Sequence, residues 1–75
     1  MYQLELSGPG NFKRIPCKTK DEARKAWEKA SRETFPVESF GKTHNTHWNL
    51  WELFKDGELI TEGYFTDYAK TVKEN

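Results

Sequence analysis

The side chains of this sequence best suited to holding a metal are two histidines and one cysteine. His44 and His47 form a His-x-x-His pair, and Cys17 is the single cysteine of the chain. A structural zinc site needs four ligands, and a catalytic one needs three with an open position. The sequence marks no fourth ligand, and residues three apart on a strand lie on opposite faces. We therefore predict no metal and no cofactor.

Cys17 is also the one candidate for a thiol nucleophile. Such a thiol needs a base in contact with it, a third group that orients the base, and surroundings that lower its pKa. Arg14 and Lys18 are near in sequence, but a lone cysteine at a strand end is more typical of a small buried residue. The carboxylates offer no convincing acid–base pair. We therefore expect no catalytic residues, and we expect that the protein is not an enzyme.

Basic residues are concentrated in the first part of the chain. Residues 1–32 hold eight basic and four acidic side chains, whereas residues 33–75 hold four basic and eight acidic ones. A positive patch near the start of the predicted helix can form from Lys13, Arg14, Lys18, Lys20 and Arg24. Such a patch can meet nucleic-acid phosphates or an acidic protein surface. The alternative is an ordinary solvated helix face with internal ion pairs.

A second candidate surface lies on a hairpin near the end of the chain. Two apolar-rich runs flank Asp56-Gly57, a pair typical of a type I′ turn. The register predicted from this turn pairs Lys55 with Glu58, Phe54 with Leu59, Leu53 with Ile60, and Trp51 with Glu62. One face of the hairpin then carries Trp51, Leu53, Ile60 and Tyr64, and the other carries Trp48, Leu50, Phe54, Leu59 and Phe65.

We expect the face with Trp48 and Phe54 to be the core face beneath the helix. The face with Trp51 and Tyr64 then needs a cover, which can be the first hairpin, a terminal helix or a partner. Tryptophan and tyrosine are enriched among the residues that dominate binding at interfaces. An aromatic sheet face can also stack unpaired bases, but the hairpin carries Glu52, Glu58 and Glu62, which repel phosphates.

Length and composition limit the choice further. The chain has 75 residues and a formal net charge of zero, from 12 basic and 12 acidic side chains. It is long enough for one domain, residues 1–75, and its neutrality argues against a generally basic nucleic-acid binder and an acidic DNA mimic. One cysteine excludes an internal disulfide. The sequence shows no apolar stretch of membrane-spanning length and no signal-peptide pattern, so we expect a cytoplasmic protein with no membrane partner.

The elements that must position these surfaces follow from periodicity and turn residues. Tyr2, Leu4 and Leu6 alternate with polar residues, which predicts a strand, and a second strand returns over residues 12–17. Pro16 has no N–H to donate, so this second strand is expected to lie at the sheet edge or to end at Pro16. Thr19 and Glu22 form a capping box, which predicts a helix over Lys20–Glu33. Its apolar stripe comprises Ala23, Ala26, Trp27 and Ala30. Residues 36–45 show no clear period and indicate a loop.

These elements predict an α+β fold. We expect a small two-layer domain in which a four-stranded antiparallel sheet carries one main helix on one face, in the order ββαββ. A short C-terminal helix is predicted to begin after Thr66 and to place Tyr68, Ala69 and Val72 on one side.

In size and strand–helix order the chain resembles small phage-encoded inhibitors that dock on host machines such as RNA polymerase or CRISPR effector complexes. The resemblance rests on architecture alone, carries over no residue, and implies a protein or nucleoprotein partner. We therefore expect a non-enzymatic binding protein that blocks or modulates a larger macromolecule and has no small-molecule substrate. The alternative is a small nucleic-acid-binding domain.

The candidate partner-binding residues are Lys13, Arg14, Lys18, Lys20, Arg24, Trp51 and Tyr64. The sequence favours the basic patch over the hairpin, because so small a domain needs its aromatics for its own core.

Overall fold

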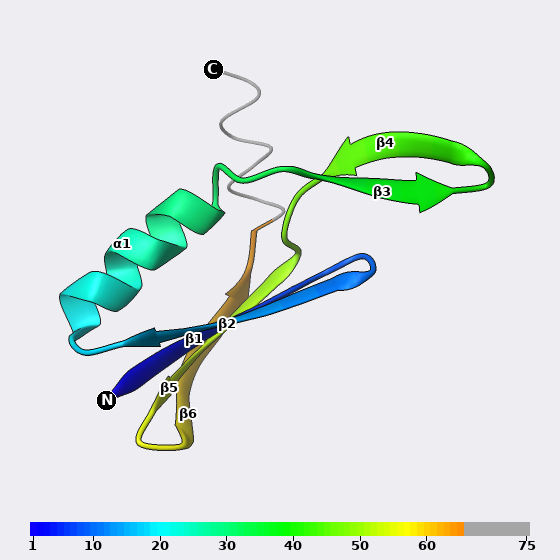
Figure 1. The fold of residues 1–75 in the computed structure, drawn as a ribbon. Helices are drawn as coiled ribbons and strands as arrows, with labels where there is room; N and C mark the ends of the chain where they lie inside the picture. Colours follow the sequence, from blue (N-terminus) through cyan, green and yellow to red (C-terminus); the bar gives the residue numbers. More distant parts are fainter. Residues whose placement is uncertain (66–75) are drawn as a thin grey trace.

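The computed structural model describes residues 1–65, in which six strands form two antiparallel sheets, accompanied by one helix (Figure 1). In chain order the elements are β1 (Tyr2–Gly8), β2 (Asn11–Cys17), α1 (Lys20–Ala30), β3 (Phe35–Ser39), β4 (Lys42–Thr46), β5 (Leu50–Lys55) and β6 (Glu58–Tyr64). The short helix predicted after Thr66 lies outside the described residues. Within residues 1–65, no helix has the length and apolar character needed to traverse a bilayer.

The larger sheet has the strand order β2-β1-β5-β6, so the predicted four-stranded antiparallel sheet is confirmed. β1 lies inside it and pairs with β2 on one side and β5 on the other. β2 is an edge strand, as Pro16 indicated, because proline has no N–H to donate to a neighbouring strand. The turn after β1 ends in Gly10, whose φ of +68° a glycine adopts without strain.

The main helix begins where the sequence predicts. The Thr19 hydroxyl accepts a hydrogen bond from the Glu22 amide at 3.1 Å, which confirms the N-cap. The Glu22 carboxylate accepts from the Lys18 amide at 2.8 Å instead of the Thr19 amide. The helix ends at Ala30, three residues before the predicted end. Its Ala23 and Ala30 are buried against the sheet, and Trp27 packs on the same core, as its apolar stripe indicated.

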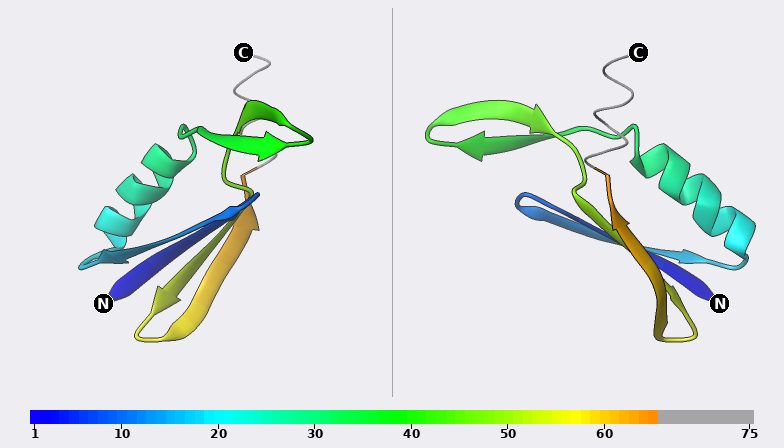
Figure 2. Two further views of the ribbon diagram at one scale, coloured as in Figure 1. Left: turned by 45° about the vertical axis from the view of Figure 1, so that its right-hand side comes forward. Right: turned by 180° about the vertical axis from the view of Figure 1, so that it is seen from behind.

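The predicted loop over residues 36–45 is wrong, because this segment forms a second hairpin from β3 and β4. Its turn is Phe40-Gly41, with φ of +53° and +75°, a backbone that Asn-Gly or Asp-Gly pairs usually adopt. Phenylalanine is not a turn residue, which is why the pattern did not reveal the turn. The hairpin packs against the rest of the protein through the Phe35 ring, whose centroid lies 4.7 Å from that of the Trp48 ring. Its tip points away from the main sheet, and Phe40 there is fully exposed (Figures 1 and 2).

Helix α1 lies across one face of the larger sheet (Figure 2). The core beneath it contains Leu4, Leu6, Ala30, Trp48 and Phe65, with a smaller cluster of Cys17, Ala23 and Leu53 beside it. For β5, the prediction of which face of the β5–β6 hairpin packs on the core is therefore wrong. Leu4 and Leu6 of β1 pair with Leu53 and Trp51 of β5, and this pairing places Leu53 and Trp51 on the sheet face under the helix. Leu50 and Phe54 point to the opposite face.

A β-bulge changes the predicted register of β5 with β6. The Asp56-Gly57 turn has φ of +50° and +86°, in agreement with type I′, and the predicted Phe54–Leu59 pair is confirmed. The register then shifts by one residue. Leu53 is opposite Thr61 and Trp51 is opposite Gly63, instead of Ile60 and Glu62. Tyr64 is consequently opposite Leu50, so Trp51 and Tyr64 lie on opposite faces of the sheet and not on one face.

Candidate functional site

One helix cannot cover a four-stranded sheet. An α-helix with its side chains is about 10 Å wide, and strands lie about 4.8 Å apart, so α1 spans about two strands. It packs on β1 and β2. On the same face, beside β5 and β6, a groove with a cavity volume of about 570 Å³ remains. The groove is lined by Leu4, Lys20, Asp21, Ala23, Arg24, Trp27, Trp51, Leu53 and Thr61.

Two tryptophans give the groove its shape. Trp27 of α1 and Trp51 of β5 meet edge to face, with ring centroids 6.0 Å apart and an interplanar angle of 76°. Trp27 also stacks on Phe65, with centroids 5.9 Å apart. Aromatic pairs in these arrangements are favourable and hold the rings in fixed orientations. The groove therefore has rigid apolar walls.

The rim of the groove carries charge from the first turns of α1. Asp21 pairs with Lys25 (3.8 Å), and Arg24 pairs with Glu28 (3.4 Å). Lys20 lines the groove and forms no ion pair with any described residue. Lys20 is exposed. This end of the groove thus presents uncompensated positive charge.

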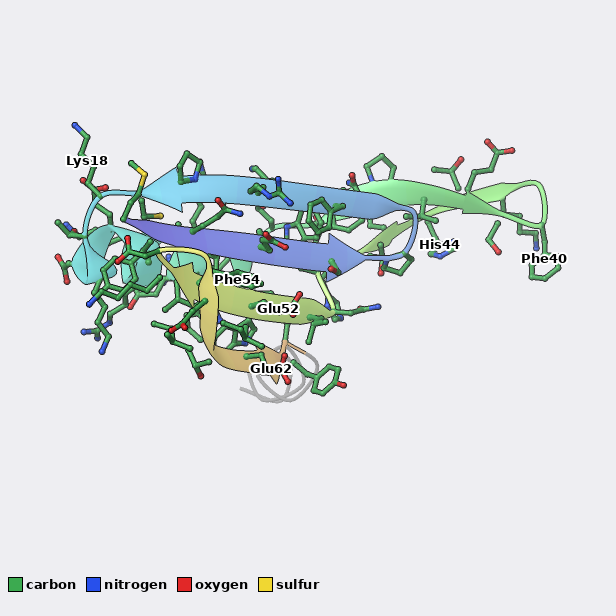
Figure 3. All side chains as sticks on the ribbon, turned by 90° about the horizontal axis from the view of Figure 1, so that it is seen from below. Lys18, Phe40, His44, Glu52, Phe54 and Glu62 are labelled. Atoms are coloured by element: carbon green, nitrogen blue, oxygen red, sulfur yellow. The ribbon has the colours of Figure 1, made fainter. Side chains whose placement is uncertain are left out.

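Three predicted binding residues meet at this groove, namely Lys20, Arg24 and Trp51. Lys18, in the link between β2 and α1, does not line the groove, and Figure 3 shows its side chain beyond the end of β2, pointing away from β5 and β6. Two predicted members of the basic patch lie elsewhere, because neighbouring residues of a strand point to opposite faces. Lys13 pairs with Glu33, past the other end of the helix, at 3.8 Å. Arg14 pairs with Glu5 at 3.2 Å on the sheet face opposite α1.

Tyr64 also lies on the sheet face opposite α1, where it is 72% exposed. The predicted binding residues therefore do not form one surface. Sequence reasoning placed Trp27 in the core alone and did not identify Thr61. The available signal was geometric, since one helix over four strands leaves part of a face open.

Cys17 is buried at the end of β2, and its thiol donates to the Ile15 carbonyl at a distance of 3.7 Å. Burial raises the pKa of this thiol, and the nearby Glu22 carboxylate raises it further. The thiol is therefore held protonated. An activated nucleophile requires the reverse, a lowered pKa.

The two histidines lie apart from the groove. His44 is on β4 opposite Val37, and His47 follows that strand. The His47 Nδ1–H donates to the carbonyl of Trp48 at 2.8 Å. Within residues 1–65, no group of three or more histidine, cysteine or acidic side chains could hold a metal ion.

Comparisons with protein-family models, with curated proteins and with solved structures find no match to this chain.

Proposed function

We propose that this protein is a non-enzymatic binding protein that docks on a partner protein through the groove and blocks or modulates that partner stoichiometrically. The observation that carries the proposal is the apolar cavity of about 570 Å³ between α1 and β5–β6, with Trp27 and Trp51 in its walls. Sites that accept drug-sized ligands or anchor side chains have volumes of about 300–1,000 Å³ and mostly apolar walls.

The apolar walls favour a bulky apolar side chain of the partner as the occupant. Rigid indoles lose little conformational entropy on binding, and buried aromatic anchors contribute most of the affinity at protein interfaces. An occupant that fills the space beside Trp51 and Leu53 removes further apolar surface from water, at about 25 cal/mol per Å².

The rim favours negative charge on the same partner segment. Lys20 forms no ion pair within residues 1–65, and Arg24 shares only a surface pair with Glu28. A segment with acidic residues beside its apolar anchor would compensate this charge and would associate faster at low salt. The partner chemistry is therefore an acidic peptide segment with a large apolar side chain.

A nucleic-acid partner fits this arrangement less well. The five basic residues of the predicted patch do not form one surface, because Lys13 and Arg14 pair with Glu33 and Glu5 away from the groove. Phosphate binding also depends on several basic side chains acting together along a backbone, which the apolar walls of the groove do not provide.

The proposal is tested by selecting binders from a displayed library of random short peptides on the immobilised protein. The variant Thr61→Trp places an indole in the groove from the exposed strand β6, and Thr43→Trp makes the same change on the remote strand β4. We expect peptides with acidic residues beside an aromatic or large aliphatic residue. They should bind the wild type and Thr43→Trp, and should lose binding to Thr61→Trp. Peptides that bind all three proteins equally would contradict a function for the groove.

A further inference from the structure

The described residues leave the sheet face opposite α1 open. Figure 3 looks onto this face, and within residues 1–65 no helix or second sheet lies over it. Large apolar side chains on it are partly in solvent, with Phe12 54% exposed, Leu59 47% and Tyr64 72%. Exposed apolar side chains that share a sheet face are a feature of docking surfaces.

The strand register arranges the side chains of this face in three rows that cross all four strands. The central row is Arg14, Glu5, Glu52 and Glu62, in the order β2-β1-β5-β6. One flanking row is Pro16, Gln3, Phe54 and Leu59, and the other is Phe12, Ser7, Leu50 and Tyr64. The three glutamates therefore form an acidic row between two mostly apolar rows, and Figure 3 labels Glu52, Phe54 and Glu62 on it.

Only one end of the acidic row is neutralised. The Glu5 carboxylate accepts hydrogen bonds from Arg14 Nε at 3.2 Å and from Gln3 Nε2 at 2.8 Å. Glu52 and Glu62 are direct cross-strand partners, and neither forms an ion pair with a described residue. Like charges directly opposite each other in a sheet repel and destabilise it. The β5–β6 half of the face thus keeps negative charge that no described residue offsets.

We infer that this open face is a second docking surface, and that its occupant is a basic amphipathic helix of a partner protein. Lysine or arginine side chains of that helix would lie over Glu52 and Glu62, and its apolar side chains would cover Phe54, Leu50 and Tyr64. Cβ atoms three or four residues apart on a helix are about 5–6 Å apart, which matches the spacing of about 5 Å between opposite residues of neighbouring strands. A helix that crosses the strands can therefore place a basic residue over each glutamate.

Charge excludes two other occupants of this face. A nucleic acid would bring phosphates against the acidic row, and a second copy packed face to face would oppose two such rows. The face also lies on the other side of the sheet from the groove, whose rim is positive. The two surfaces therefore select segments of opposite charge and can be occupied at the same time.

The test selects displayed random peptides on the Thr61→Trp variant, whose groove is closed. This inference goes beyond the groove, so its outcome does not depend on groove binding. We expect peptides with lysine or arginine at helical spacing among apolar residues. The double substitution Glu52→Gln with Glu62→Gln should raise the Kd of these peptides about tenfold, which corresponds to about 1.4 kcal/mol, because it removes two opposite-charge contacts.

The matched control is the double substitution Glu38→Gln with Glu58→Gln, which removes the same charge from two exposed residues outside the row. It should leave the Kd within about twofold. Recovery of no basic peptides, or equal Kd values for the two double variants, would overturn the inference. If Thr61→Trp does not fold, as judged by circular dichroism, selection on the wild type with counter-selection on the Glu52/Glu62 variant decides the same question.

Discussion

The indole of Trp51 on β5 lies directly against the backbone of Gly63 on β6. A Cβ atom added at Gly63 would lie 2.8 Å from Cζ2 of Trp51, which is closer than real Cβ atoms approach other heavy atoms, and 3.0 Å from its Cε2 and Nε1. The glycine thus lets the indole lie over β6 and form a wall of the groove. The β-bulge between Leu53 and Phe54 produces this pairing, because it shifts β6 by one residue and brings Gly63 opposite Trp51.

Gly63→Ala is expected to destabilise the protein by about 1–3 kcal/mol, because the indole must move out of a packed position. Urea unfolding followed by fluorescence measures the loss. Thr61→Ala, on the same strand and exposed, is the control and should change the free energy of unfolding by less than about 0.5 kcal/mol. Equal stability of the two variants would show that Trp51 is not fixed by Gly63.

Glu62→Gln is expected to raise the free energy of unfolding by about 0.5 kcal/mol, because it removes repulsion from the Glu52 carboxylate opposite it. The control Glu58→Gln should have no such effect, since Glu58 is opposite Lys55 and loses an attractive pair. Thermal melts at low and high salt check both values. A loss of stability in Glu62→Gln would contradict the account of the acidic row.

Phe40→Asn is expected to stabilise the protein by about 1 kcal/mol. Phe40 is fully exposed and its φ is +53°, so phenylalanine bears the steric cost of the left-handed region without burying its ring. Asn-Gly is a preferred pair for this turn. The comparison variant Phe35→Ala removes a ring packed on Trp48 and should destabilise the protein. A large loss of stability in Phe40→Asn would contradict the exposure of the ring.

The raised pKa of Cys17 predicts a specific dependence of stability on pH. The folded state disfavours the thiolate, so the protonated thiol contributes to the free energy of unfolding. This contribution is fully present below the pKa of the thiol in the unfolded chain, about 8.5, and is lost as pH rises through its pKa in the folded protein. The wild type should therefore lose more stability than Cys17→Ala between neutral and alkaline pH. Urea unfolding across that range measures the difference, and parallel curves for the two proteins would show an unshifted thiol.

The sequence predicted elements whose signals are local. The Thr19 cap, the edge position of Pro16 and the Asp56-Gly57 turn each depend on neighbouring residues, and each is confirmed. The β3–β4 hairpin was missed because its turn begins with Phe40, which is atypical of turns. The face of β5 was assigned wrongly because Leu53 and Trp51 are selected for the core by their partners in β1, and no local pattern shows that pairing.

The groove was only partly predictable. Lys20, Arg24 and Trp51 were identified by residue type, and the structure brings them together. Lys13 and Arg14 were included because they are close in sequence, but alternation along β2 separates them from each other and from the helix start. The bulge that separates Trp51 from Tyr64 has no signature in the hairpin sequence, so their faces could not be assigned beforehand.

The most direct test of groove binding is an NMR titration of the ¹⁵N-labelled protein with a peptide selected on the wild type. The three tryptophan indoles give separate signals and lie in different places. Trp27 and Trp51 line the groove, whereas the indole of Trp48 is buried and donates to Glu33 at 2.9 Å. The account predicts that the indole signals of Trp27 and Trp51 shift with saturation at one peptide per protein, while that of Trp48 stays in place. A bound peptide that leaves the Trp27 and Trp51 signals unmoved would contradict it.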